Sequence, residues 1–216
     1  MPEPSPPRKR RHEVLAEFRQ GEILAAARRV FARRGFEAAT LDEIAAAAGL
    51  AKGTLYLYFD SKETIFWEAL RECLETLRQR ARRAMDAAPD VRGRLRAAVV
   101  VRCELMRNDA EFMRIYLTEF GHLCAHPTRY RKNFRDFYLD LARDLAVVIE
   151  QGVREGALRP VPPLETALML ALMVRDFFTS RFLGLFDDQT EPEQFIFDLF
   201  WRGVHGETIA PASGTL

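Results

Sequence analysis

Two short helical patterns meet at Gly49, and their spacing dictates the local fold of residues 41–58. Ile44 is an apolar anchor of the first helix, and Ala45 is small enough for a second helix to approach closely. Gly49 supplies the turn, and Leu55 faces inward from the second helix. A small contact residue, a turn glycine and inward apolar residues are what a helix-turn-helix requires. The sequence therefore predicts two helices packed at a steep angle.

The remaining residues of the second helix suit a nucleic-acid groove. Lys52 carries a positive charge, and Thr54 offers a short hydroxyl near base edges. Tyr56 and Tyr58 present phenolic groups that can donate hydrogen bonds to phosphates. The alternative is an ordinary pair of packed helices whose tyrosines complete the core. Spacing alone does not decide between these two interpretations.

The wider sequence resembles the TetR family of bacterial transcription regulators. The resemblance is strongest over residues 20–70, where AARRVFARRGFEAAT, the Ala-Gly turn, KGTLY and YFDSKE occur in order. It implies that the protein binds double-stranded DNA as a homodimer. The positions that it assigns to DNA contact are Thr40, Lys52, Gly53, Thr54, Tyr56, Tyr58 and Lys62. Ala51 departs from the family pattern, which usually has Ser or Thr there, so one polar contact fewer is expected.

Helical patterns punctuated by Gly and Pro continue to the end of the chain, and no alternating strand pattern appears. Gly35 ends the first pattern, and the capping box of Thr40 and Glu43 begins the next. We expect an all-α fold of about nine helices, one of them at 110–124: a three-helix unit followed by a larger bundle. The predicted domains are a disordered basic arm (1–11), a helix-turn-helix domain (12–60) and a ligand-binding and dimerisation domain (61–216).

Positive charge is concentrated near the N-terminus. The 216 residues carry 32 Lys and Arg against 31 Asp and Glu, a net charge of +1, but residues 8–34 hold nine basic and three acidic residues. The RKRR segment, residues 8–11, follows a proline-rich start. We expect this arm to enter a minor groove or to follow phosphates, with a solvated tail as the alternative.

The last two helical patterns indicate a dimer. The pattern that begins at Leu164 is apolar nearly all round, so it needs cover on two sides, and the final pattern makes a similar demand. A second copy of the chain can supply that cover, which would place two recognition helices about 34 Å apart on a pseudo-palindromic operator. The candidate interface residues are Leu172, Phe178, Phe195, Leu199 and Trp201.

Aromatic and methionine side chains are frequent between these two regions. They are core residues by default, but they can also line a cavity for a small apolar or aromatic effector. Arg102 lies on an apolar stripe, where a charge needs a partner: Glu104, Glu119, Asp176 or the carboxylate of a ligand. The candidate pocket residues are Arg102, Met106, Tyr116, Phe120, His122 and Asp176.

Several other classes of protein are disfavoured. His122, Cys124 and His126 have metal-ligand chemistry, but Pro127 ends their helix, so we predict no metal and no cofactor. Three scattered cysteines favour a reducing cytoplasm, and the longest apolar stretch is far shorter than the roughly 20 residues of a membrane span. No secretory signal or clustered catalytic signature appears.

The predicted protein is therefore not an enzyme but a cytoplasmic, dimeric regulator that binds a specific DNA sequence. We expect a repressor that a small ligand releases from its operator. The alternative is a ligand-insensitive DNA-binding or architectural protein.

Overall fold

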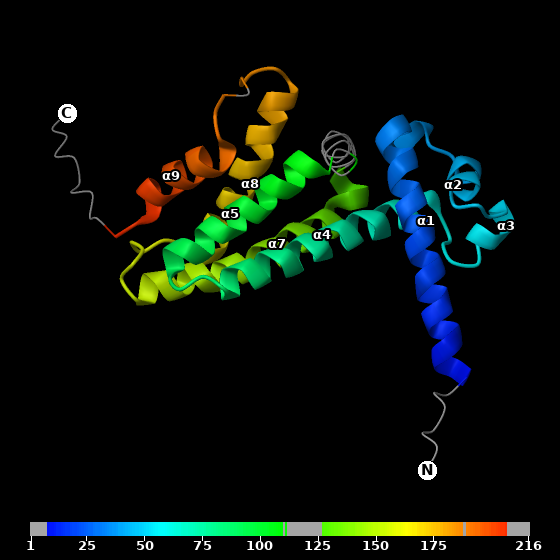
Figure 1. Ribbon diagram of the computed structural model, residues 1–216, viewed down its shortest axis with the longest axis horizontal. Helices are drawn as coiled ribbons and strands as arrows, with labels where there is room; N and C mark the ends of the chain where they lie inside the picture. Colours follow the sequence, from blue (N-terminus) through cyan, green and yellow to red (C-terminus); the bar gives the residue numbers. More distant parts are fainter. Residues whose placement is uncertain (1–7, 110, 112–126, 188, 207–216) are drawn as a thin grey trace, which may run out of the picture. The chain divides into compact units, whose positions relative to one another are not determined.

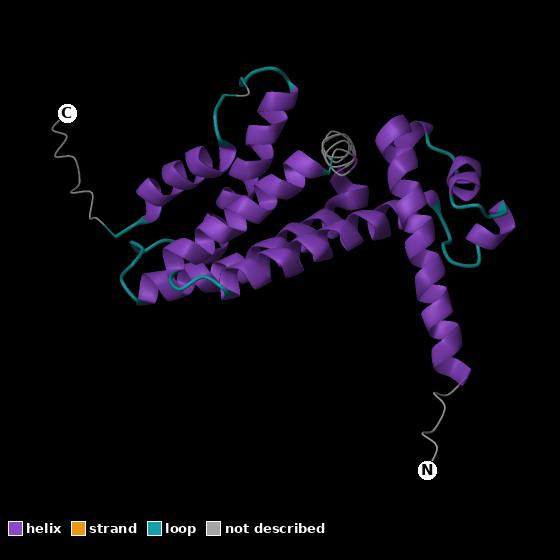
Figure 2. Ribbon diagram, in the orientation of Figure 1, coloured by secondary structure: helices purple, strands orange, loops and turns teal. Residues whose placement is uncertain are grey.

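The computed structural model describes the backbone of residues 8–109, 111, 127–187 and 189–206, and side chains from Glu13 onward except at 110, 112–134, 137, 141, 188 and 207–216. The described residues form eight helices and no strand (Figure 2). This confirms the predicted all-α architecture. The helix expected over residues 110–124 lies almost wholly outside the described residues.

The chain divides into two compact units. The first holds α1 (Arg8–Ala38), α2 (Leu41–Ala47), α3 (Lys52–Leu55) and the start of α4 (Lys62–Asp86), together with Asp109. The second holds the rest of α4, α5 (Val91–Asn108), α7 (Pro127–Arg154), α8 (Pro163–Phe182) and α9 (Pro192–Val204) (Figure 1). The chain passes from one unit to the other within α4, between Cys73 and Leu74, and again between Asn108 and Asp109.

The division falls within α4, whereas the sequence places a domain boundary before it, between residues 60 and 61. An aromatic cluster explains the difference. Phe66 of α4 meets Phe31 and Phe36 of α1 edge-on, with ring centroids 5.3 and 5.2 Å away. Because these rings bury each other, the first turns of α4 belong to the core of the first unit.

The first helix is longer than predicted at its N-terminus. α1 begins at Arg8, so residues 8–11 of the expected arm form a helical turn. Lys and Arg are good helix formers, so this basic run can belong to the helix. Near the other end, Gly35 has a φ of 74° and breaks the helical geometry where the sequence predicts the helix to end.

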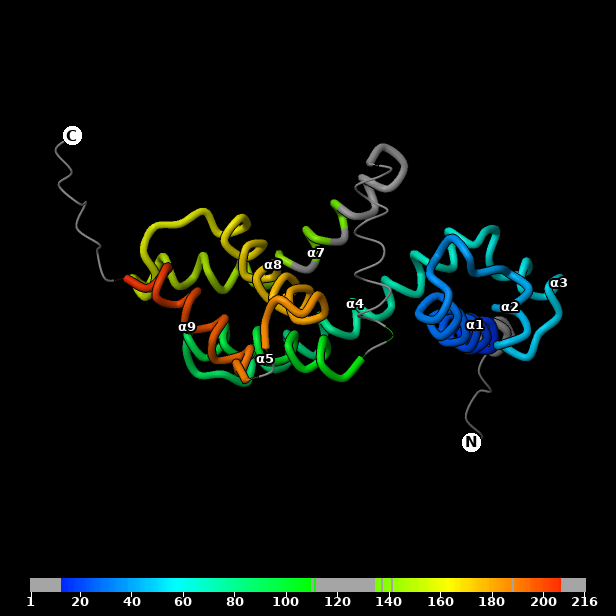
Figure 3. Tube along the Cα trace, turned by 90° about the horizontal axis from the view of Figure 1, so that it is seen from above, coloured from blue at the N-terminus to red at the C-terminus, as the bar shows by residue number. Residues whose placement is uncertain are grey.

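The second unit is a bundle built around α5. This helix packs against α7, α8 and α9, and α8 also packs against α7 and α9. Figure 3 shows α5, α8 and α9 side by side. The core of the second unit includes the fully buried side chains of Leu95, Leu145, Ile149, Leu170 and Ile196. No helix among the residues described here is both long and apolar enough to span a membrane.

Candidate nucleic-acid interface

The turn between α2 and α3 has the geometry that the sequence predicts. Gly49 adopts a φ of +68°, a left-handed conformation that glycine reaches without steric cost. The Leu50 N–H donates to the Ala45 carbonyl at 2.9 Å, and the Gly49 N–H donates to the Ala46 carbonyl at 3.1 Å. These two bonds form a Schellman motif, which ends α2 and directs the chain into α3.

Burial separates the inward from the outward residues of this motif. Ile44 and Leu55 are completely buried, and Ala45 is buried as well. Lys52 and Gly53 are exposed, Tyr56 is 48% exposed, and Thr54 and Tyr58 are half-buried. Tyr56 therefore does not complete the core, which argues against the alternative of an ordinary helix pair.

The second helix of the motif is shorter than its predicted extent to Tyr58. Regular α-helix ends at Leu55, and residues 56–58 form a turn. The Leu57 N–H donates to Thr54 and the Tyr58 N–H donates to Leu55, a tighter i to i+3 pattern. This turn leaves Leu57 80% exposed between the two tyrosines. Sequence reasoning missed Leu57, although an apolar side chain there could contact a thymine methyl group.

Lys52 is held by a carboxylate that the sequence analysis did not consider. Its Nζ donates to Asp42 Oδ2 at 2.7 Å, and this bond raises the pKa of Lys52. Asp42 lies in the first turn of α2, so the ion pair joins the two helices of the motif. Both side chains remain accessible, 47% exposed for Lys52 and 66% for Asp42.

The predicted capping box at Thr40 is confirmed. The Thr40 N–H donates to Glu43 Oε2 at 3.1 Å, and the Glu43 N–H donates to Thr40 Oγ1 at 3.2 Å. Arg34 binds the other oxygen of Glu43 at 3.0 Å. The hydrogen bond from the Thr40 backbone is the main cause that lowers the pKa of Glu43. A phosphate at Thr40, as the resemblance implies, would have to displace Glu43 from that N–H.

Lys62 has a structural role, whereas the resemblance implies a phosphate contact. Its Nζ donates to the carbonyls of Phe36, Glu37 and Ala39 at 2.7, 3.0 and 3.0 Å. An ammonium group has three donors, so all three are engaged. Carbonyls at a helix C-terminus lack helical partners and attract a cation. Lys62 therefore caps the end of α1, and a phosphate contact of Lys62, as the resemblance implies, would have to replace one of these bonds.

The candidate pocket residues are only partly described. Arg102 and Met106 are buried on α5, and Asp176 on α8 has a 60% exposed side chain. Tyr116, Phe120 and His122 lie outside the described residues, as do Cys124 and His126. Within the part of the chain that is described, no cluster of three His, Cys, Asp or Glu side chains could hold a metal ion.

Asp176 binds Arg175, its neighbour in the sequence. Arg175 Nε lies 2.7 Å from Asp176 Oδ1, and Arg175 Nη1 donates to the Tyr138 hydroxyl of α7 at 3.1 Å. Arg175 and Arg102 are the two buried charged side chains among those described. A buried guanidinium needs hydrogen-bonding partners. The bundle therefore needs polar partners at these two positions of its apolar core.

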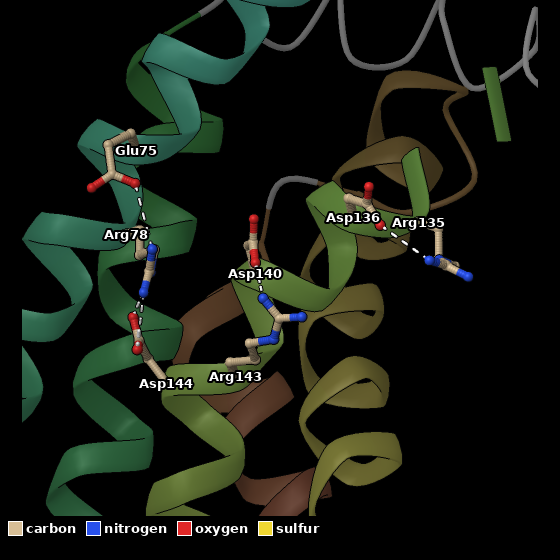
Figure 4. A network of polar contacts seen from close by, with 7 residues as sticks. All are labelled: Glu75, Arg78, Arg135, Asp136, Asp140, Arg143 and Asp144. Atoms are coloured by element: carbon tan, nitrogen blue, oxygen red, sulfur yellow. Dashed lines mark hydrogen bonds and ion pairs between the residues drawn. The ribbon is translucent and has the colours of Figure 1, made fainter. Parts of the chain in front are cut away.

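An ion pair also connects α4 to α7 within the second unit (Figure 4). Arg78 Nε donates to Asp144 Oδ2 at 2.8 Å, and Glu75 lies 3.7 Å from the same guanidinium. The hydrogen bond to Asp144 raises the pKa of Arg78. The second half of α4 is therefore fixed to the bundle by charge as well as by apolar packing.

The candidate dimer residues differ in exposure. Phe195 and Leu199 are about half exposed on one face of α9, while Leu172 and Trp201 are half-buried. Phe178 is buried within its own unit, where it packs against Phe177, so it offers little surface to a second copy of the chain. Sequence reasoning missed Met169, which is exposed on α8. An all-apolar helix gives no signal for which of its faces lies outward.

A buried inter-helix contact, a left-handed glycine turn and an exposed basic and phenolic face define a helix-turn-helix DNA-binding protein. The family model described as "Bacterial regulatory proteins, tetR family" matches residues 23–69. The repressor KstR2 of Rhodococcus jostii is 33% identical over 154 residues, which cover 69% of this chain and 72% of KstR2. The chain belongs to the TetR family of bacterial transcription regulators.

Two further relatives differ in what they cover. The activator FasR of Mycolicibacterium smegmatis is 35% identical over 116 residues, covering 51% of this chain and 53% of FasR. The crystal structure of the regulator FadR from Bacillus subtilis in complex with stearoyl-CoA has a TM-score of 0.73 at 20% identity, covering 85% of this chain and 98% of that one. The second similarity supports the fold of both units.

Proposed function

We propose that the protein is a homodimeric repressor that binds a pseudo-palindromic operator and leaves it when an acyl-CoA or similar apolar effector binds the second unit. The observation that carries the DNA-binding part is the outward face of α3. Lys52 of α3 and Tyr56 of the turn that follows it are exposed on either side of the completely buried Leu55. A fixed helix with an exposed basic side chain is what contact with a major groove requires.

Each residue of this face has a distinct role in the proposal. Lys52 contributes charge to a phosphate or a base edge, and Gly53 lets the backbone approach the DNA closely. Thr54 contributes a short hydroxyl, and Tyr56 and Tyr58 donate to phosphates. Lys62 is left out because its three donors already bind carbonyl groups.

The effector part is supported by the buried arginines and by the FadR similarity. An acyl-CoA combines an apolar chain with an anionic head, and the second unit combines an apolar core with Arg102 and Arg175. In this mechanism the effector binds more tightly to a state in which α4 is displaced. Because α4 belongs to both units, its displacement changes the separation of the two recognition helices, and operator affinity falls.

Repression is favoured over activation because KstR2, which this chain matches over more of its length than FasR, is a repressor. A reporter gene placed downstream of the bound DNA shows whether the protein represses or activates transcription. Deleting the regulator should raise expression, and a fall in expression would indicate an activator.

The DNA contacts are tested on a duplex selected from a randomised library with the wild-type protein. Replacing Lys52 and Tyr56 together with alanine should abolish specific binding while the protein stays folded and dimeric. Arg82→Ala, which removes an exposed cation from the second unit, is the matched control and should bind normally. Normal binding by the double variant would refute the assigned face.

The effector is tested by titrating stearoyl-CoA into the protein–duplex complex, with free coenzyme A as the control. The proposal is supported if stearoyl-CoA releases the duplex from the protein and free coenzyme A does not. Binding of stearoyl-CoA without a change in duplex affinity would favour the ligand-insensitive alternative.

A further inference from the structure

Asp42 places a carboxylate beside the cation that the proposed DNA contact depends on. Its side chain is the more exposed of the pair, and its Oδ2 lies 2.7 Å from Lys52 Nζ. Phosphates repel a carboxylate at such a surface, so Asp42 weakens DNA binding unless something compensates. A residue with this cost on the DNA-contacting face calls for an explanation.

The fold does not require a carboxylate at this position. Glu43 and Thr40 make the capping box, and Asp42 takes no part in it. Asp42 is also exposed, so it takes no part in the apolar core that includes Ile44 and Leu55. An amide at position 42 would keep the shape of the side chain and the first turn of α2. Apart from the small contribution that any first-turn carboxylate makes to a helix, the charge of Asp42 therefore acts through Lys52.

We propose that Asp42 is a specificity-determining residue that suppresses binding to non-cognate DNA by holding the charge of Lys52. The inference rests on the proposed function, in which Lys52 contacts DNA. A phosphate that approaches Lys52 must replace Asp42 or share the ammonium with it. Other DNA sequences must replace Asp42 at the ammonium, whereas the operator can place an acceptor that shares the ammonium with Asp42.

The two kinds of complex respond differently because they depend on different contacts. Non-specific binding depends almost entirely on electrostatic contacts with phosphates. Neutralising Lys52 therefore removes one of a small number of such contacts. On the operator, base-edge contacts fix the motif in register, and a precisely placed acceptor can share the Lys52 ammonium with Asp42, because an ammonium group has three donors. The operator complex then forms without breaking the ion pair. Asp42 thus widens the difference in affinity between the operator and other DNA.

The test compares Asp42→Asn with the wild-type full-length protein on two probes: the selected duplex and a mixed-sequence duplex of the same length. Across a salt series, the variant should bind the mixed-sequence duplex about two- to fivefold more tightly, the range expected from releasing one exposed ion pair. Its salt dependence should steepen by about 0.9 in log–log slope, the contribution of one added phosphate contact. The gain on the selected duplex should be smaller, so the specificity ratio falls.

Three matched variants show whether the effect passes through Lys52. Asp60→Asn removes one negative charge from the same unit and should produce a smaller gain. Lys52→Met should weaken binding to both probes, and adding Asp42→Asn to it should restore little. An equal gain from Asp60→Asn, or a full gain in the Lys52→Met background, would reduce Asp42 to a general charge effect and overturn the inference.

Two outcomes separate this inference from the proposed function. If Asp42→Asn binds the selected duplex more weakly, Asp42 accepts a hydrogen bond from a base such as the cytosine amino group, and the inference is wrong while the interface stands. If Lys52→Met changes neither probe, the proposed DNA contact of Lys52 is itself wrong. Thermal unfolding of every variant verifies that the first unit is folded.

Discussion

Lys62 Nζ donates to the Phe36 carbonyl at 2.7 Å and lies 4.6 Å from the centroid of the Phe36 ring. Lys62 thus binds both the backbone carbonyl and the ring face of Phe36, the residue that follows the helix break at Gly35. The contact joins the start of α4 to the end of α1. Because α1 also packs against α2, both α4 and the helix-turn-helix are attached to α1.

Lys62→Met should lower the free energy of unfolding of the first unit by about 1–3 kcal/mol, the usual range for hydrogen bonds to a charged group. The cause is that three carbonyls at the end of α1 lose their donor. Chemical denaturation measures the change. Lys52→Met is the matched control, and its loss should stay within about 1 kcal/mol because the pair with Asp42 is exposed.

The opposite pattern would return Lys62 to the DNA interface. Wild-type stability together with a shallower salt dependence of DNA binding would show that its ammonium contacts phosphate rather than the end of α1.

The predictable parts of the first unit depend on neighbours in the sequence. Thr40 and Glu43 are three residues apart, and the two bonds around Gly49 join residues three and five apart, so local patterns define them. The contact of Lys62 with Phe36 spans 26 residues. It depends on how α4 returns to α1, and no local pattern encodes that path.

The second unit was harder to predict for a different reason. Its helices are apolar on more than one face, so periodicity shows that they are buried but not which partner buries each side. Phe178 and Met169 of α8 are both apolar, yet the first is buried and the second exposed. Only the packing of α5, α7 and α9 around α8 distinguishes them.

Gly53→Ala separates stability from DNA binding. A Cβ at Gly53 meets no atom within 4 Å, and the residue is helical, so alanine should leave the protein as stable or stabilise it by up to about 1 kcal/mol. The added methyl group should still weaken binding to the selected duplex, because the backbone can no longer approach as closely. Binding assays and thermal unfolding on the same samples measure both effects.

Gly21→Ala is the control for this substitution. Gly21 lies in α1 with equally open space around its Cβ position. Alanine there should also be neutral or stabilising, with normal DNA binding. Normal binding by Gly53→Ala would mean that the DNA does not approach α3 closely.

Glu43 should make the stability of the first unit sensitive to acid. Its pKa is lowered in the folded protein by the Thr40 backbone N–H, so Glu43 contributes stability above the unfolded pKa of about 4.3. That contribution is lost as the pH falls through the lower folded pKa. Unfolding measured between pH 7 and pH 3 should show a smaller decrease for Glu43→Gln than for the wild type. If the stability of the two proteins fell equally with pH, protonation of Glu43 would not contribute to the acid sensitivity of the first unit.

Asp109 offers a test of how the two units communicate. Asp109 Oδ2 lies 2.5 Å from Arg28 Nη2 of α1, and both side chains are about one quarter exposed. The Cys73 thiol lies near this pair, and burial raises its pKa to about 11. Asp109→Asn should therefore destabilise the first unit by about 1–3 kcal/mol, because it weakens a charged hydrogen bond to a half-buried guanidinium.

The same variant should also reduce the effect of an effector on DNA binding. Asp109 directly follows Asn108, the last residue of α5, so a shift of α5 in the second unit pulls on a residue that is fixed to α1 in the first. With that attachment weakened, stearoyl-CoA should still bind, but the ratio of duplex affinities without and with it should decrease. Asp198→Asn on α9 removes the same charge from the second unit and should leave the ratio unchanged. An unchanged ratio for Asp109→Asn would assign the coupling to α4 alone, since α4 is the other described segment that joins the two units.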